Sequence, residues 1–338
     1  MTKNPHAVNK RLVFERMAAI ADADEDQLEA AIANAYTDDA ELSCFHPVND
    51  VAGLAEIHDC LWQPLKRAMP DLERRDLIVA GGDFDGKQVV AAMGHYQGTF
   101  RSGWIDIAAS YGVVYLRYGE LHEIVGTKIR RSYVLIDVLD LLHQVGRWPI
   151  APSLGAEGMW AGPTTHDGVA LGDADPVRGA ATLDLVKLMH GALLSFDGKT
   201  LDSMDHGRYW TPDFMWYGPS GIGTTRGLEG FRLHHQIPFL RAFPDRTVGK
   251  RIVSIGDGDY AVTGGWPSVV ATHTGPDWLG LPPTGRRVNM RVMDFYRAEG
   301  ALLAENWVPI DVIDILRQLG VDVLDRVRHR DGKPRRDL

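Results

Sequence analysis

Apolar and polar residues follow the same order of patterns twice along the chain. Residues 10–35 are rich in helix formers with apolar residues at helical spacing, and residues 182–204 repeat this pattern. Each half then has a short apolar run typical of a strand, Ala40–Phe45 or Phe214–Tyr217. A further helix is predicted from Gly53 to Pro70 and from Gly227 to Pro244. Each half is therefore predicted to open with helices.

Extended runs rich in Val, Thr, Tyr and Trp follow, separated by Gly-Asp or Glu-Gly turns. In the second half they are Arg251–Ile255, Tyr260–His273, Arg286–Arg297 and Leu302–Val308. Each half ends in a short amphipathic helix, Asp137–Gln144 or Asp311–Gln318, that a glycine stops. Helices followed by strands predict an α+β module, a cone-shaped barrel in which a curved antiparallel sheet carries helices on one face.

The two halves align without a gap at a shift of 174 residues. Tyr36–Asp71 falls on Trp210–Asp245, and Ser132–Gly146 falls on Asn306–Gly320. A period this long predicts two compact domains rather than a solenoid. We expect a first, degenerate module over residues 1–147, a Pro/Gly-rich linker over 148–181 and a second module over 182–338. The modules are expected to pack through their apolar outer sheet faces as a pseudo-dimer within the chain.

Composition narrows the classes of partner. The chain of 338 residues is 45% hydrophobic and 24% charged, with a formal net charge of −9, which argues against nucleic acid as a partner. The two cysteines, Cys44 and Cys60, have no metal-ligand spacing. Charges interrupt the N-terminal apolar residues before a signal-length run forms, and no run is long enough for a bilayer span. We expect a cytoplasmic protein without membrane contact.

Differences between the halves point to candidate chemistry. His235 shares a helical face with apolar residues, and its counterpart is Leu61. It is either a hydrogen-bonded core histidine or a donor or base that faces a pocket. Neighbouring His234 points about 100° away on the helix. Asp294 alternates with apolar residues on one face of a predicted strand, so its carboxyl is paired, protonated or at a cavity, and the first half keeps an acid, Glu120, at the same place.

Other aromatic and charged residues of the second half complete the candidate set. His273 and Trp266 replace Thr99 and Ala92 of the first half, so both are specific to the second. Trp278 and Arg291 match residues of the same type in the first half, Trp104 and Arg117, which favours a structural role. Asn306 and Trp307 lie at the end of the last predicted strand.

Three segments of the second half resemble the SnoaL-like polyketide cyclases of the nuclear transport factor 2 superfamily. They are GLEGFRLHHQIPFLRAFPD, VNMRVMDFYRAEG and LLAENWVPIDVIDILRQLG. The resemblance implies the cone-shaped α+β fold, and in that family the strand position of Asp294 contributes to the pocket. Asn306 stands where the family often has His. Val308 stands where the members that close a ring carry an acid/base Asp.

The leading hypothesis is a cofactor-independent enzyme of the cyclase or isomerase type, with its pocket in the second module. Asp294 transfers a proton next to a carbonyl, and His235 or His273 stabilises the oxyanion. The substrate is expected to be a small, mostly apolar or aromatic carbonyl or polyketide-like compound. The expected substrate-binding residues are Trp216, Tyr217, His234, Trp266, Trp278, Arg291, Asn306 and Trp307.

Two other functions stay open at this point. One is a non-catalytic module that binds a small molecule, and the other is a hydrolase or hydratase that activates a water between Asp294 and a histidine. No metal site is expected, because the histidines have no recognised ligand spacing. No cofactor is expected either, since no Gly-rich phosphate loop follows a strand. A homodimer is left open.

Overall fold

The computed structural model describes residues 5–276 and 278–333 and contains two compact units. The first unit comprises Met1–Pro149, Val169–Asp173 and Asp311–Leu338, and the second comprises Ile150–Gly168 and Ala174–Ile310. This division differs from the expected domains at both ends of the second module. The segment from Asp311 groups with the first unit because its helix α9 (Val312–Gln318) packs on α5 (Val138–Gln144). Residues 150–168, expected as linker, belong to the second unit.

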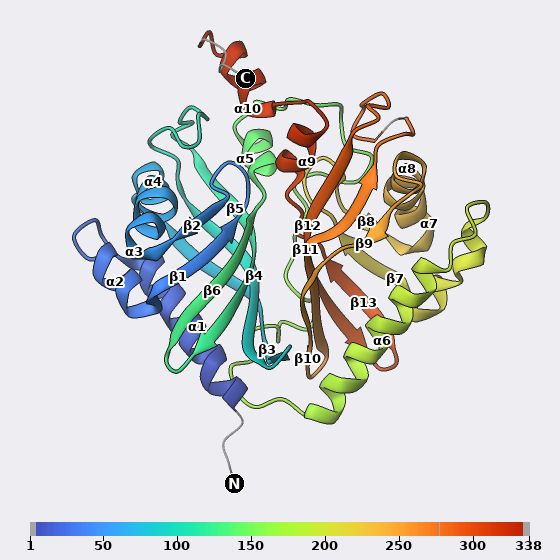
Figure 1. Ribbon diagram of the computed structural model, residues 1–338, viewed down its shortest axis with the longest axis horizontal. Helices are drawn as coiled ribbons and strands as arrows, with labels where there is room; N and C mark the ends of the chain where they lie inside the picture. Colours follow the sequence, from blue (N-terminus) through green and yellow to red (C-terminus); the bar gives the residue numbers. More distant parts are fainter. Residues whose placement is uncertain (1–4, 277, 334–338) are drawn as a thin grey trace. The chain divides into compact units, whose positions relative to one another are not determined.

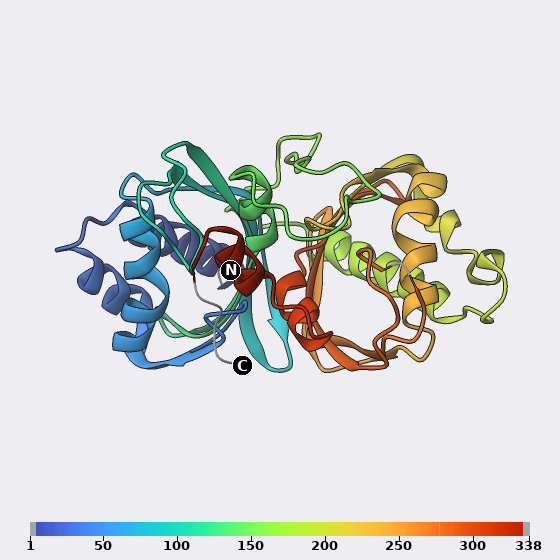
Figure 2. The same ribbon diagram turned by 90° about the horizontal axis from the view of Figure 1, so that it is seen from above.

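The first unit is a six-stranded sheet with the order β2-β1-β6-β5-β4-β3. Its strands are β1 (Tyr36–Cys44), β2 (Asp50–Ala52), β3 (Glu73–Phe84), β4 (Lys87–Thr99), β5 (Val113–Val125) and β6 (Lys128–Ile136). Its helices include α1 (Pro5–Asp22), α2 (Leu28–Ala35), α3 (Gly53–Glu56), α4 (Gln63–Ala68) and α10 (Val323–Arg330). Helices α1 to α4 gather on one side of this sheet (Figures 1 and 2).

The second unit repeats the design with a seven-stranded sheet, in which β10-β11-β12-β13-β7-β8 are neighbours and β9 pairs with β11. Its strands are β7 (Trp210–Tyr217), β8 (Thr225–Arg226), β9 (Thr247–Val248), β10 (Arg251–Asp257), β11 (Tyr260–Thr272), β12 (Arg287–Glu299) and β13 (Leu302–Trp307). Its helices are α6 (Pro176–Leu194), α7 (Gly227–Phe231) and α8 (Ile237–Ala242), with 3-10 turns at Leu201–Met204 and His206–Tyr209. The predicted α+β class is confirmed for both units.

The predicted antiparallel sheet is found in each unit with one parallel pairing, so both sheets are mixed. β1 runs parallel to β6, and β7 runs parallel to β13. Parallel neighbours need a long crossover connection. The helices and strands between β1 and β6 provide that length, and those between β7 and β13 do the same.

The helix predicted from Gly227 to Pro244 is interrupted by a π-helical turn at Arg232–Gln236, and its counterpart in the first unit is interrupted at Ile57–Trp62. A proline follows each turn within two residues, at Pro238 and Pro64. Proline has no N–H and its ring clashes with the carbonyl four residues earlier, so the helix widens there. In the second unit, His235 lies in this widened turn.

Helix α6 packs closely against the second sheet. A Cβ atom on Gly179 would lie 2.7 Å from the carbonyl oxygen of Gly256 in β10, so only glycine allows this approach. The contact fixes α6 over β10 and β11 and thereby the position of its later residues. None of the helices in the described part of the chain has the length and hydropathy of a membrane span.

Candidate active site

A cavity of about 280 Å³ lies inside the second unit, between its sheet, helix α6 and the helix that contains the π-helical turn. Strand β12 contributes Met290, Val292, Asp294 and Tyr296 to its wall. Period-two alternation predicts that these four residues share one face of the strand. The cavity is mostly apolar, which makes each polar side chain in its wall a candidate for function.

Strand register brings the polar wall residues together. Tyr296 in β12 lies opposite Asn306 in β13, and Asn306 lies opposite Trp216 in β7. Asp294 lies two residues before Tyr296 on the same face, opposite Thr263 in β11. The four strands therefore place a carboxyl, a phenol and an amide side by side.

Asp294 is the acid of this cavity. Burial raises the pKa of its carboxyl to about 7, although hydrogen bonds with Tyr296 and Asn306 and the positive charge of Arg251 lower it. The free energy lost by removing the carboxylate from water thus outweighs these three stabilising contacts. Near neutral pH the carboxyl is present in both its protonated and its ionised form, which suits a group that accepts and returns a proton.

Tyr296 connects Asp294 to His190 of α6. Its hydroxyl lies 2.9 Å from Nε2 of His190, and it also forms hydrogen bonds with Asp294 and Thr263. Burial raises the pKa of Tyr296 well above its ordinary value and lowers that of His190 to about 4. Both groups are therefore neutral at pH 7. Sequence reasoning missed His190, although its place at helical spacing from Val186 in an apolar stretch was a usable signal.

An aromatic wall contains His235. Its imidazole stacks on Trp216 with ring centroids 4.2 Å apart and also contacts Phe231 and Phe239. Burial lowers the pKa of His235 to about 3, so the ring is neutral. Its Nδ1 is buried and has no hydrogen-bond partner among the described residues. Of the two alternatives for His235, this position favours a side chain that faces the cavity. His206, which sequence reasoning missed, also lines the cavity, and burial lowers its pKa to about 4.

The structure separates His273 from the other two expected catalytic residues. His273 is fully buried and does not line the cavity. Its Nδ1 lies 3.2 Å from the hydroxyl of Thr284, and its ring packs on Phe243. The residues of β11 after Val269 do not line the cavity, and His273 follows them. We therefore propose no role for His273 in stabilising an oxyanion.

The other expected substrate-binding residues divide between the cavity and separate contacts. Trp216 and Asn306 line the cavity, whereas His234 and Trp278 line a separate hollow of about 150 Å³. Outside the cavity, the ring of Tyr217 stacks on Trp307 with centroids 5.2 Å apart. The indole N–H of Trp307 donates to the carbonyl oxygen of Ala161 at 2.7 Å.

Trp266 and Arg291 also lie outside the cavity wall. The guanidinium of Arg291 lies 5.1 Å from the ring centroid of Trp266. The pairing of β11 with β12 changes register between Gly265 and Val269, so the alternation of faces breaks at Trp266.

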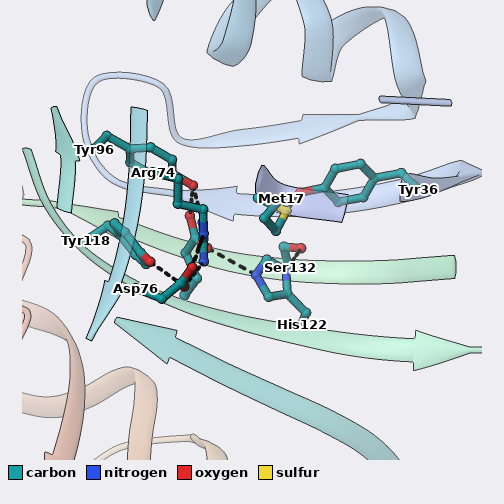
Figure 3. Close-up of polar contacts among 9 residues, drawn as sticks. Met17, Tyr36, Arg74, Asp76, Tyr96, Tyr118, His122 and Ser132 are labelled. Carbon is teal, nitrogen blue, oxygen red and sulfur yellow. Dashed lines mark hydrogen bonds and ion pairs between the residues drawn. The ribbon is translucent and has the colours of Figure 1, made fainter. Parts of the chain in front are cut away.

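The first unit has an ionic network at the equivalent place. Glu120, the counterpart of Asp294, accepts hydrogen bonds from Arg74 at 2.8 Å and from Tyr96 at 2.7 Å. Arg74 also pairs with Asp76, and Nδ1 of His122 lies 2.7 Å from Oγ of Ser132 (Figure 3). The other ring nitrogen of His122 lies 3.2 Å from Oε2 of Glu120. Burial works to raise the pKa of Glu120, but the charge of Arg74 and hydrogen bonds with His122 and Tyr96 lower it to about 2.

One substitution explains much of this difference between the units. At the shift of 174 residues, Arg74 corresponds to Val248, which lines the cavity of the second unit. Val248 is shorter and has no charge, so Asp294 lacks the counterpart of the Arg74 guanidinium, and the charge of Arg251 lowers its pKa less than burial raises it. The counterpart of His122 is Tyr296, and that of Ser132 is Asn306. The second unit therefore combines open space with an acid whose pKa is near neutral.

Fold and cavity together define an α+β module with a mostly apolar cavity, and Asp294 is the one carboxyl among the described residues that line it. Residues 193–319 match the family model of the SnoaL-like polyketide cyclases. The match covers the strands that line the cavity and confirms the resemblance seen in the second half of the sequence. No curated protein matches the chain.

Several solved structures are similar to one part of the chain. AclR from Streptomyces galilaeus is 21% identical over 43% of this chain and 99% of its own length, with a TM-score of 0.36. IdmH from Streptomyces antibioticus is 25% identical over 40% of this chain and 99% of its own, with a TM-score of 0.32. A SnoaL-like polyketide cyclase from Agrobacterium tumefaciens is 18% identical over 40% and 95%, with a TM-score of 0.32.

Proposed function

We propose that the second unit is a cofactor-independent acid/base enzyme of the cyclase or isomerase type. Its substrate is a mostly apolar carbonyl or polyketide-like small molecule. The observation that carries the proposal is the Asp294 carboxyl, which lies in an apolar cavity with a pKa of about 7. A general acid or base works best when its pKa lies near the working pH.

In this proposal the ionised Asp294 carboxylate removes a proton from a carbon next to the substrate carbonyl. The electron pair of the broken C–H bond forms the enolate, and the negative charge develops on the carbonyl oxygen. Protonated Asp294 then returns the proton to a different atom of the substrate, which completes an isomerisation, or to the oxygen formed when the enolate closes a ring. The hydrogen bonds of Tyr296 and Asn306 hold the carboxyl in place.

His235 is the proposed donor to the enolate oxygen. A neutral imidazole carries one N–H, and its pKa of about 3 keeps the ring neutral throughout the working range. Stacking on Trp216 fixes the plane of the ring. A donor that is already oriented stabilises the developing charge without reorganisation, and loss of one such donor typically lowers the rate by about 10² to 10³.

Deuterium exchange into 2-tetralone, an apolar aromatic ketone with acidic protons next to its carbonyl, tests the proposal without knowledge of the natural substrate. The protein is expected to accelerate exchange in ²H₂O, followed by NMR. Asp294→Asn should lower the accelerated rate by about 10² or more. Glu299→Gln, which changes an exposed acid at the other end of β12, should leave it unchanged. Equal rates in the wild type and Asp294→Asn would refute the assignment.

A further inference from the structure

A second hollow of the second unit, about 630 Å³ in volume, lies between the end of α6, residues 196–201 and helix α8. Apolar residues form part of its wall, among them Leu201, Ile237 and Leu240. Leu194 lines both this hollow and the cavity that contains Asp294, so the two spaces adjoin.

Three cations line the hollow: Lys199, Arg241 and Arg246. Arg246 is half-buried, and its guanidinium lies 5.5 Å from the ring centroid of Phe196. Burial lowers the pKa of Arg246, although its guanidinium also donates to the carbonyl oxygen of Phe243 at 3.5 Å. In the described part of the chain, none of the three cations forms an ion pair with a carboxylate.

The nearest acids in the sequence have other partners. Oδ1 of Asp197 accepts hydrogen bonds from the backbone N–H groups of Lys199 and Thr200, each at 2.8 Å. Oδ1 of Asp245 accepts from the backbone N–H of Thr272 at 2.7 Å. Both carboxylates therefore stabilise turns and strand ends, and the side-chain charges of the hollow are left for another anion.

The first unit provides an internal comparison. The counterpart of Arg241 is Arg67, which pairs with Glu25 at 3.3 Å. At the same shift of 174 residues, Glu25 corresponds to Lys199, and Leu72 corresponds to Arg246. The second unit has therefore replaced the acid that neutralises this arginine with a second cation and has added a third. The fold does not require a cation at the position of Lys199, because the first unit has the acid Glu25 there.

We propose that this hollow binds the acid end of an organic anion that has an apolar body. Guanidinium groups match the planar, two-oxygen geometry of a carboxylate, and Lys199 adds a mobile point charge. The apolar residues of the wall contact the apolar body of the ligand. The site is distinct from the proposed acid/base chemistry, and its ligand is recognised by charge rather than by Asp294.

Calorimetric titration of the full chain with decanoate, decanol and inorganic phosphate tests the site. Decanoate should bind saturably and more tightly than decanol or phosphate. Lys199→Glu and Arg246→Leu, which restore the first-unit residues, should each weaken decanoate binding by about tenfold or more. Lys187→Glu, the same charge reversal on the exposed face of α6, should leave the affinity unchanged.

The outcomes separate this site from the proposed enzyme. Asp294→Asn should bind decanoate as tightly as the wild type, whatever its effect on exchange into 2-tetralone. Equal affinity for decanol would refute the charge recognition, and phosphate binding as tight as that of decanoate would refute the role of the apolar wall. No saturable decanoate binding, or full binding by Lys199→Glu, would overturn the site.

Discussion

Replacing Asp294 with asparagine is expected to stabilise the second unit at alkaline pH, in addition to its effect on turnover. The pKa of the carboxyl is about 7 in the folded protein against an ordinary value of 3.8. A group with a raised folded pKa contributes stability below its unfolded pKa and loses it as the pH rises through the folded pKa. The wild type should therefore lose stability between about pH 4 and pH 7 and remain at that level above it.

The magnitude follows from the difference between the two pKa values. About three pH units at about 1.4 kcal/mol each correspond to about 4 kcal/mol of unfolding free energy. Asparagine keeps a similar shape and can hydrogen-bond, but it does not ionise, so it does not carry this penalty. For a unit of this size, about 4 kcal/mol corresponds to a rise in melting temperature on the order of 10 °C.

Thermal unfolding followed by circular dichroism at pH 5 and pH 9 measures this difference. Because the chain has two compact units, the informative transition is the one that Asp294→Asn shifts. The gain in melting temperature should be small at pH 5 and large at pH 9, while Glu299→Gln should show no such dependence. A gain of the same size at both pH values would refute the argument that ionisation of Asp294 is costly.

Two further changes test the polar contacts of each unit. Tyr296→Phe removes a hydrogen bond that lowers the pKa of Asp294. The pH at which the exchange rate reaches half of its maximum on the acidic side should therefore rise by about one unit. An unchanged pH midpoint would contradict the contact. Arg74→Met leaves Glu120 and Asp76 buried without a counter-charge, and the unfolding free energy of the first unit should fall by about 3–5 kcal/mol. Unchanged denaturant unfolding would show that this network does not depend on Arg74.

Local patterns predicted the elements well because each is specified by nearby residues. The run that contains Asp294 alternates with period two, and the structure forms β12 there with Met290, Val292, Asp294 and Tyr296 facing one cavity. Asp137 and Asp311 cap α5 and α9, since each accepts from the backbone N–H three residues later. Comparison between the halves selected His235, and period-two alternation selected Asp294, because a polar group at an apolar position indicates a special environment.

The remaining features depend on contacts that no local pattern contains. The parallel pairing of β7 with β13 joins segments far apart in sequence, and His190 reaches Tyr296 only because α6 crosses the sheet. His273 has a side chain suited to acid/base chemistry, but it follows the end of β11, which lies outside the cavity. Val248 leaves the Asp294 carboxyl without the ion pair that Arg74 forms with Glu120 in the first unit, and the sequence around Val248 does not contain this information.

Titration of the Asp294 carboxyl itself shows whether this group has a pKa near neutral. Carbon-13 NMR of protein labelled at the aspartate carboxyl carbons follows each carboxyl with pH, and the resonance of Asp294 is the one that Asp294→Asn lacks. We expect a titration midpoint near pH 7. A midpoint at or below about 4, the value of an ordinary aspartate, would contradict it.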